Sequence, residues 1–184
     1  MIRNDHFFED IRKILLAFFN AQSAPATSWT FILDYPDKHF FHKWAKPFIW
    51  LENISPIGRM ESQYNFHSTS VVGGSTYKNY VYLMEMELRI GAWLAEKHGG
   101  MEEINIIRSW LLNLFNPPLP KLPSTTFNVT LGATAYTNTT LYAQGIRQIS
   151  VLGDNNVPTE DIKEFRRELN LYLLAVMGDS VLVT

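Results

Sequence analysis

Cysteine is absent from the 184 residues of this chain, which excludes several kinds of chemistry together. The chain can form no disulfide, hold no metal through thiolates and offer no cysteine nucleophile. Its stability must therefore come from a packed core. A chain of this length is long enough to build such a core as one domain, residues 1–184.

Charge is also scarce. Charged residues make up 18% of the chain, whereas about a quarter is usual in soluble domains. The 16 basic and 18 acidic residues leave a net charge of −2, and no run of Lys or Arg supplies the positive surface that tight nucleic-acid binding needs. The shortage of charge is a first indication that a partner protein, rather than water, covers part of the surface.

Long hydrophobic runs are missing as well. No window approaches 18 uninterrupted apolar residues, so the sequence predicts no transmembrane helix and no membrane partner. The first six residues do not combine a basic start with an apolar stretch, so we expect no signal peptide. The chain also lacks a G-x-S-x-G elbow and both phosphate-binding glycine fingerprints.

Two segments have the spacing of amphipathic helices. Residues 5–19 carry one broad apolar stripe, and residues 101–115 carry another before Asn116-Pro117-Pro118 ends the pattern. The stripe positions are Phe7, Phe8, Ile11, Ile14, Leu15, Phe18 and Phe19 in the first segment, and Ile104, Ile107, Leu111, Leu114 and Phe115 in the second. We expect each stripe to lie against a sheet.

Alternating apolar residues predict the strands of that sheet. The clearest alternation spans Tyr80–Ile90, with its even-numbered residues on the core face, and a second spans Phe165–Val176. Shorter strands are expected at 30–33, 48–51, 127–131 and 146–152, with a turn at Gly153–Asn156. The predicted class is α+β, a mostly antiparallel β-sheet flanked by two amphipathic α-helices.

Two stretches show neither the helical spacing nor the strand alternation of apolar residues. Residues 52–79 are rich in Ser, Gly, Asn, Thr and Tyr and contain Gly73-Gly74. Loops of this length are uncommon in compact domains, so we interpret the stretch as a projecting arm or a long, irregular hairpin. Residues 116–126 form a Pro-rich connection that we expect to be extended and stiff.

The strongest cluster of ionisable residues lies on the two long strands. Glu85 and Glu87 point to the same side of one strand, as two carboxylates that act as acid and base or bind a cation would. Arg89 shares that side, and Arg166 and Glu168 lie on the last strand. Cross-strand pairing of opposite charges is a simpler use for them. We therefore expect a polar sheet face or a subunit contact, with no catalysis and no cofactor.

Other candidate sites carry weaker signals. His39 and His42 have the spacing of a metal pair, but no carboxylate-rich helix accompanies them, so we predict no metal site. The aromatic residues of 40–50, interleaved with lysines, could stack single-stranded nucleic acid. We favour a core segment whose lysines extend to the surface.

Taken in order, these elements resemble the tail terminator (tail-completion) family of long-tailed bacteriophages. The parallels are the first helix, the strand Phe48–Leu51 ending in Glu52, and the long strand that ends in Gly91-Ala92-Trp93 before a polar turn and a helix. A strand, a polar turn and a terminal alternating strand complete the match.

The resemblance implies a non-enzymatic virion protein, assembled in the host cytoplasm, that forms a homo-oligomeric ring of usually six subunits. Such a ring caps the tail tube, ends its polymerisation and joins it to a head-completion or neck protein, while genomic DNA passes through without specific binding. The charged strand residues then become candidates for a subunit interface or a channel lining. The candidate residues for contacting the tube or neck are Arg59, Tyr64, Phe66, His67 and Tyr77.

Other functions remain open at this point. The nearest alternatives are another phage neck or head-completion protein, or a tube-capping protein of a contractile injection system. A nucleic-acid-binding module that uses residues 40–50 is more distant. A cation-dependent enzyme using Glu85 and Glu87 is the remotest.

Overall fold

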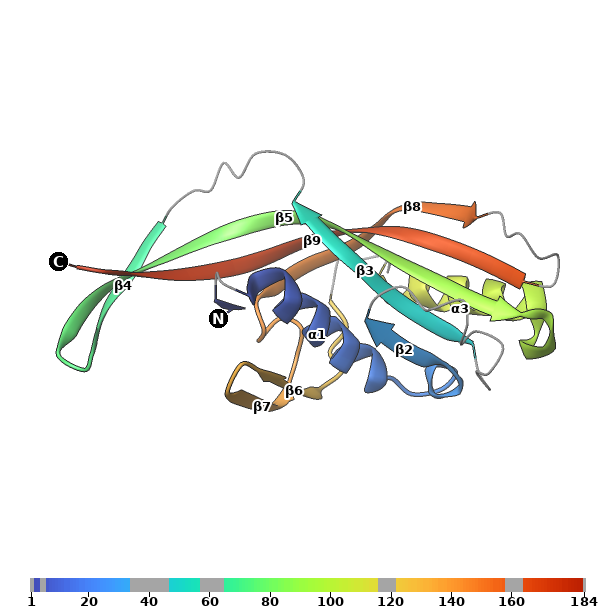
Figure 1. Ribbon diagram of the computed structural model, residues 1–184, viewed down its shortest axis with the longest axis horizontal. Helices are drawn as coiled ribbons and strands as arrows, with labels where there is room; N and C mark the ends of the chain where they lie inside the picture. The colour runs from blue at the N-terminus through green and yellow to red at the C-terminus, as the bar shows by residue number, and fades with distance from the viewer. Residues whose placement is uncertain are drawn as a thin grey trace.

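Two long antiparallel strands form the centre of the structure (Figure 1). The computed structural model describes residues 2–3, 6–33, 47–56, 65–115, 122–157 and 164–183. Strand β5, Ser75–Ala95, pairs with β9, Glu164–Leu182, from Tyr77 opposite Leu182 to Ala95 opposite Glu164. Both predicted alternating strands are confirmed, and each extends beyond its predicted ends.

Further strands line both outer edges of this pair. Along β5 lie β3, Phe48–Pro56, and then β4, Asn65–Val72. Along β9 lie β8, Ile146–Val157, and the two-residue β1, Ile2–Arg3. Strand β2, Thr30–Leu33, completes the sheet beside β3. The pairings of β1 with β9 and of β2 with β3 are parallel and the others are antiparallel, which confirms a mostly antiparallel α+β fold.

Two α-helices in the described part of the chain cover the same face of the sheet. They are α1, Phe7–Asn20, and α3, Gly100–Phe115, with short 3₁₀ helices η2 (Ala26–Ser28) and η3 (Glu96–His98) preceding β2 and α3. The predicted apolar stripes pack into one core with alternate residues of β5 and β9. Phe8, which was placed in the first stripe, is an exception, because it is 37% exposed and lies outside this core. The sheet contributes Met84, Met86, Leu88, Ile90, Leu169, Leu171, Leu173 and Ala175 to this core.

A small hairpin adds a second layer beside α1. Strands β6, Phe127–Leu131, and β7, Thr134–Thr139, pair only with each other among the described strands. Phe127 and Val129 are buried, and the Phe127 ring lies 6.1 Å from the Phe18 ring of α1. The predicted strand at 127–131 is confirmed. The described part of the Pro-rich connection, residues 122–126, has no regular secondary structure.

The turn predicted at Gly153–Asn156 is wrong, because β8 continues through these residues to Val157. Their pairing runs from Gly153 opposite Asn170 to Val157 opposite Arg166, after a register shift next to Val151. Residues such as Gly, Asp and Asn favour turns, but β9 offers a continuous row of backbone partners here. The pairing with β9 overrides the local preference.

The hairpin predicted within residues 52–79 is confirmed for the described residues, and its strands pair regularly from Ser68 to the turn. Strand β3 continues to Pro56, and β4 joins β5 through Gly73-Gly74. The two glycines have φ values of 58° and 83°, as the tight turn of a two-residue hairpin requires. The sequence lacks a core-facing stripe here because no described helix packs on this hairpin (Figure 1).

We call the part of the sheet that projects past the helices the arm: β4, residues 75–81 of β5 and residues 178–182 of β9 (Figure 1). Apart from Gly178, no arm residue whose exposure is described is buried. Side-chain contacts join its strands, since the Asn79 amide donates to the Ser68 and Ser70 hydroxyls at 3.1 Å each. The arm is a thin ribbon with little core of its own.

Candidate functional site

Three of the five charged residues singled out on β5 and β9, Arg89, Arg166 and Glu168, meet on the sheet face opposite the helices. Arg89 lies 3.5 Å from a Glu52 carboxylate oxygen, through Nη1, and 3.7 Å from a Glu168 carboxylate oxygen, through Nε. The other Glu168 oxygen accepts a hydrogen bond from Arg166. Four side chains from three strands therefore form one row of alternating charge. We call this row, made of Glu52, Arg89, Glu168 and Arg166, the ion row. Glu52 is the member that sequence reasoning did not include.

Burial differs along the ion row. The Glu168 side chain is 11% exposed and that of Arg166 is 21% exposed, whereas Arg89 is 49% exposed. Exposed ion pairs contribute about 0–1 kcal/mol, but a buried charge that loses its partner costs more. Glu168 is the member on which the row depends, because both arginines contact it.

A second, smaller core lies beside the ion row on the same face. It consists of Phe48, Trp50 and Trp93, all buried, and the Arg166 guanidinium carbon lies 5.2 Å from the Trp50 ring centroid. Trp50 lies directly across Gly91, its register partner on β5. A Cβ atom on Gly91 would come within 1.9 Å of the Trp50 ring, so only glycine permits this packing.

Glu85 and Glu87 lie farther along the same face, outside the ion row. Glu85 is exposed and accepts a hydrogen bond from the Tyr172 hydroxyl. Burial of the Tyr172 ring, and then the charge of Glu85, raises the pKa of Tyr172. Glu87 forms no ion pair with any described residue. Nearby Leu83 is 56% exposed, so this part of the sheet presents acidic and apolar groups together on an open face.

The residues predicted to contact a tube or neck are only partly described. Phe66 and His67 belong to β4, and Tyr77 lies on β5 opposite Ser70 and Leu182. Arg59 and Tyr64 lie outside the described residues. Among the arm residues whose exposure is described, the most exposed apolar ones are Val71 (69%) and Val72 (64%), next to the Gly73-Gly74 turn. We call Val71 and Val72 the tip.

A separate ion cluster fastens α3 to the sheet. Asp154 accepts hydrogen bonds from Arg108 of α3 and Arg167 of β9. Burial alone would raise the pKa of Asp154, but the hydrogen bonds and charges of Arg167 and Arg108 outweigh it and lower the pKa. Asp154 was expected in a turn. Its pairing was not foreseeable because Arg108 lies 46 residues away in the chain and Arg167 becomes a neighbour only through the pairing of β8 with β9.

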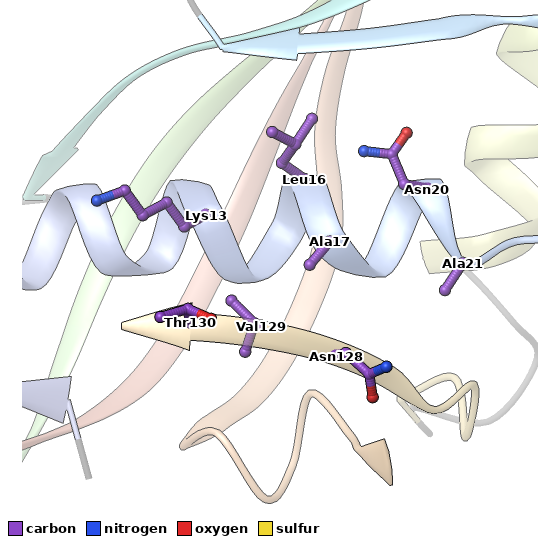
Figure 2. A pocket seen from close by; sticks show the side chains of 8 residues that line it. All are labelled: Lys13, Leu16, Ala17, Asn20, Ala21, Asn128, Val129 and Thr130. Carbon is purple, nitrogen blue, oxygen red and sulfur yellow. The ribbon is translucent and has the colours of Figure 1, made fainter. Parts of the chain in front are cut away.

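A shallow groove of about 440 Å³ runs between α1 and β6 (Figure 2). Its walls are Lys13, Leu16, Ala17, Asn20 and Ala21 of α1 and residues 128–130 of β6. The small side chains of Ala17 and Ala21 leave the space open on the helix side, opposite β6 (Figure 2). We call it the α1–β6 groove.

Several earlier candidates lie outside the described residues. These include His39, His42 and most of the aromatic segment 40–50, although Phe48 and Trp50 are described and lie in the small core. Across the described ranges, no three His, Asp or Glu side chains gather as a metal site would require.

None of the helices in the described ranges is long and apolar enough to cross a membrane.

The chain matches no protein-family model and no curated protein sequence.

Proposed function

We propose that this protein is a structural subunit that assembles with copies of itself into a ring, and that the ring is a phage tail terminator. The observation that carries the proposal is the arm, which extends past the helices and in which no residue whose exposure is described is buried apart from Gly178. Small sheets need a hydrophobic face or a packed helix for stability in water. Contact with a neighbouring subunit would provide that packing.

A ring built from one kind of subunit needs two different surfaces that fit each other, because each subunit must contact the next by the same rotation. The arm offers one such surface, and the body beneath the helices offers another. The arm is a thin ribbon and the rest of the described structure is a helix-covered sheet (Figure 1), so the two surfaces differ in shape, as head-to-tail contacts require. Subunits with two unlike surfaces form closed rings or open filaments, and capping a tube requires the closed form.

The sheet face that carries Glu85 and Glu87 suits the lining of a DNA channel. Proteins hold DNA mainly through positive charge that neutralises phosphates. Acidic groups on an open face would instead repel the passing duplex and keep it from sticking. The resemblance to tail terminators in the order of helices and strands supports this orientation and the virion location.

The direct test first searches the genes around this one for a tail-tube protein and then mixes the purified protein with tubes polymerised from it. We expect rings at tube ends in negative-stain images and a shorter, narrower distribution of tube lengths. Unchanged lengths and bare tube ends would overturn the proposal. Binding to the head connector instead of the tube would move the assignment to a neck or head-completion protein.

A further inference from the structure

We propose that the open edge of β4 in one subunit pairs with the open edge of β9 in the next subunit of the ring, so that the arms join into one continuous sheet. This inference deepens the proposed ring and rests on it. In that ring, a neighbour's body covers one face of the arm. The two edges of the arm need partners of a different kind, because they present backbone hydrogen-bonding groups.

The arm is a three-stranded ribbon whose two outer strands are both edges. Residues 77–80 of β5 pair with β4 on one side and with residues 179–182 of β9 on the other. Among the described strands, β4 pairs with β5 alone. An edge strand carries a row of unpaired N–H and C=O groups, which can pair with another chain. The arm therefore offers two such rows, one on each side.

The outer side of β9 is covered along the body and opens only in the arm. Strand β8 pairs with it from Arg166 to Ala175, and β1 pairs with Met177 and Gly178. Among the described strands, residues 179–182 have β5 as their one neighbour. Because the arm projects past the helices (Figure 1), this open edge is accessible to a second copy of the chain.

The part of β4 next to the turn lacks the features that usually protect an edge strand. Charged side chains, prolines and bulges discourage pairing with other chains. Residues 68–72 contain no charged residue and no proline, and they pair with β5 without a register shift. By contrast, β8, an edge strand of the body, carries Arg147 and Asp154 and has two register shifts. The fold protects this edge of the body and leaves the edge of the arm ready to pair.

A second copy of the arm supplies a matching edge. Strands β4 and β9 both run antiparallel to β5, so they run in the same direction. A rotation about an axis along the strands therefore places β4 of one copy beside β9 of the next as a parallel pair. The arm strands contain one lysine, Lys78, and one aspartate, Asp179, and no other Lys, Arg, Asp or Glu. Neighbouring arms would therefore meet without net repulsion.

The length of the open edges explains why the contact needs a ring. The open edge of β9 spans residues 179–182, so one such pairing is short and weak. An open row of arms leaves one unpaired edge at each end, whereas a closed ring pairs every edge. Closure also makes the last pairing intramolecular, which raises its effective concentration.

Hydrogen–deuterium exchange tests the pairing, because an amide that donates to a neighbouring subunit exchanges more slowly. We would compare the purified wild-type protein at low and high concentration and follow peptides that cover β4 and residues 179–182. The expected result is slower exchange in both segments at high concentration. Slower exchange in β4 alone would indicate a two-fold contact between two β4 edges and would overturn the inference. Unchanged exchange in both segments would also overturn it.

The variant Thr69→Glu tests whether the two segments meet each other. Thr69 is exposed and lies opposite Lys78, so a glutamate there attracts Lys78 within its own hairpin while adding a charge to the open edge. We expect the slower exchange to be lost in both segments, with an unchanged circular dichroism spectrum. Slow exchange that persists in residues 179–182 would show that these residues have another partner and would contradict the pairing.

Two controls separate the charge on the edge from other effects. Ser109→Glu adds the same charge to an exposed residue of α3 and should keep the slower exchange. Thr69→Val changes the same edge residue without adding a charge, and it should also keep the slower exchange. Loss of the slower exchange in either control would overturn the inference.

Failure of this pairing is distinguishable from failure of the proposed function. If wild-type protein caps tail tubes and forms rings without slower exchange in both segments, the pairing is wrong and the tail terminator remains. If both segments exchange more slowly but the protein never binds tubes, the pairing stands and the tail terminator is wrong. Slower exchange in β4 that requires added tube protein, with residues 179–182 unchanged, would assign the edge to the tube and rule out the second copy.

Discussion

Strands β5 and β9 differ in burial between the body, which is the part of the sheet that the helices cover, and the arm. Under the helices, Met86 and Leu88 of β5 and Leu171 and Leu173 of β9 are 0% exposed. In the arm, these strands continue to pair, yet apart from Gly178 their residues whose exposure is described lie half-buried or exposed. Backbone pairing alone can extend a sheet, but one face must be covered to give it a core. The body therefore has a buried core of its own, whereas the described part of the arm has none, and we propose that contact with another subunit covers it.

The largest expected effect comes from the body's core. Leu171→Ala would remove a fully buried side chain from β9, so we expect a loss of about 2–5 kcal/mol of unfolding free energy. Urea denaturation followed by circular dichroism measures it. A loss below about 1 kcal/mol would show that this face is not the main core.

The next effect concerns the small core on the opposite face. Gly91→Ala would place a Cβ against the Trp50 ring, and such overpacking costs about 1–3 kcal/mol. The matched control is Gly153→Ala in β8, where an added Cβ meets nothing within 4 Å. Equal midpoints of thermal unfolding for the two variants would contradict the packing of Trp50 on Gly91.

A smaller effect is expected at the cluster that fastens α3, and it depends on pH. The arginines lower the pKa of Asp154 in the folded protein. Its stabilising contribution is therefore present above the ordinary carboxyl range and disappears as the pH falls through the lowered pKa. Asp154→Asn should cost about 1–2 kcal/mol at pH 7.

Thermal unfolding of Asp154→Asn and wild type between pH 7 and pH 3 checks this sign. The difference between the two proteins should shrink towards the acidic end, because protonated Asp154 no longer attracts the arginines. A difference that grows on acidification would show that Asp154 is not stabilised by Arg108 and Arg167.

We expect the smallest effect on stability from a substitution at the tip. The same substitution is also the sharpest test of the contrast between the body and the arm. Val72→Thr keeps the side-chain shape and the strand preference while replacing one methyl group of an exposed residue with a hydroxyl. We expect a change within about 0.5 kcal/mol in monomer stability but weaker self-association in sedimentation velocity runs. A tip variant that unfolds the monomer would show that the arm has a stabilising core after all.

Much of the candidate site was recoverable from local pattern. The alternation of apolar residues placed Arg89 on the non-core face of its strand, and it placed Arg166 and Glu168 on one face of the last strand. The structure brings these three side chains into contact. The sequence did not predict Glu52 as a member of the ion row, because its pairing with Arg89 depends on the irregular register between β3 and β5. The sequence did not predict the exposed tip either, because two adjacent valines show no periodic pattern.

The sequence by itself determined both helices, the core faces of the long strands and the neutral, Ser- and Thr-rich character of the arm. These features depend on periods of a few residues, which side-chain directions along a helix or strand impose directly. Only the tertiary structure decided that Gly153–Asn156 would lie in a strand and that Trp50 would cover Gly91. It also decided that Asp154 would join α3 to β9. These outcomes depend on which distant segments become neighbours, and residues far apart in the chain set that choice together.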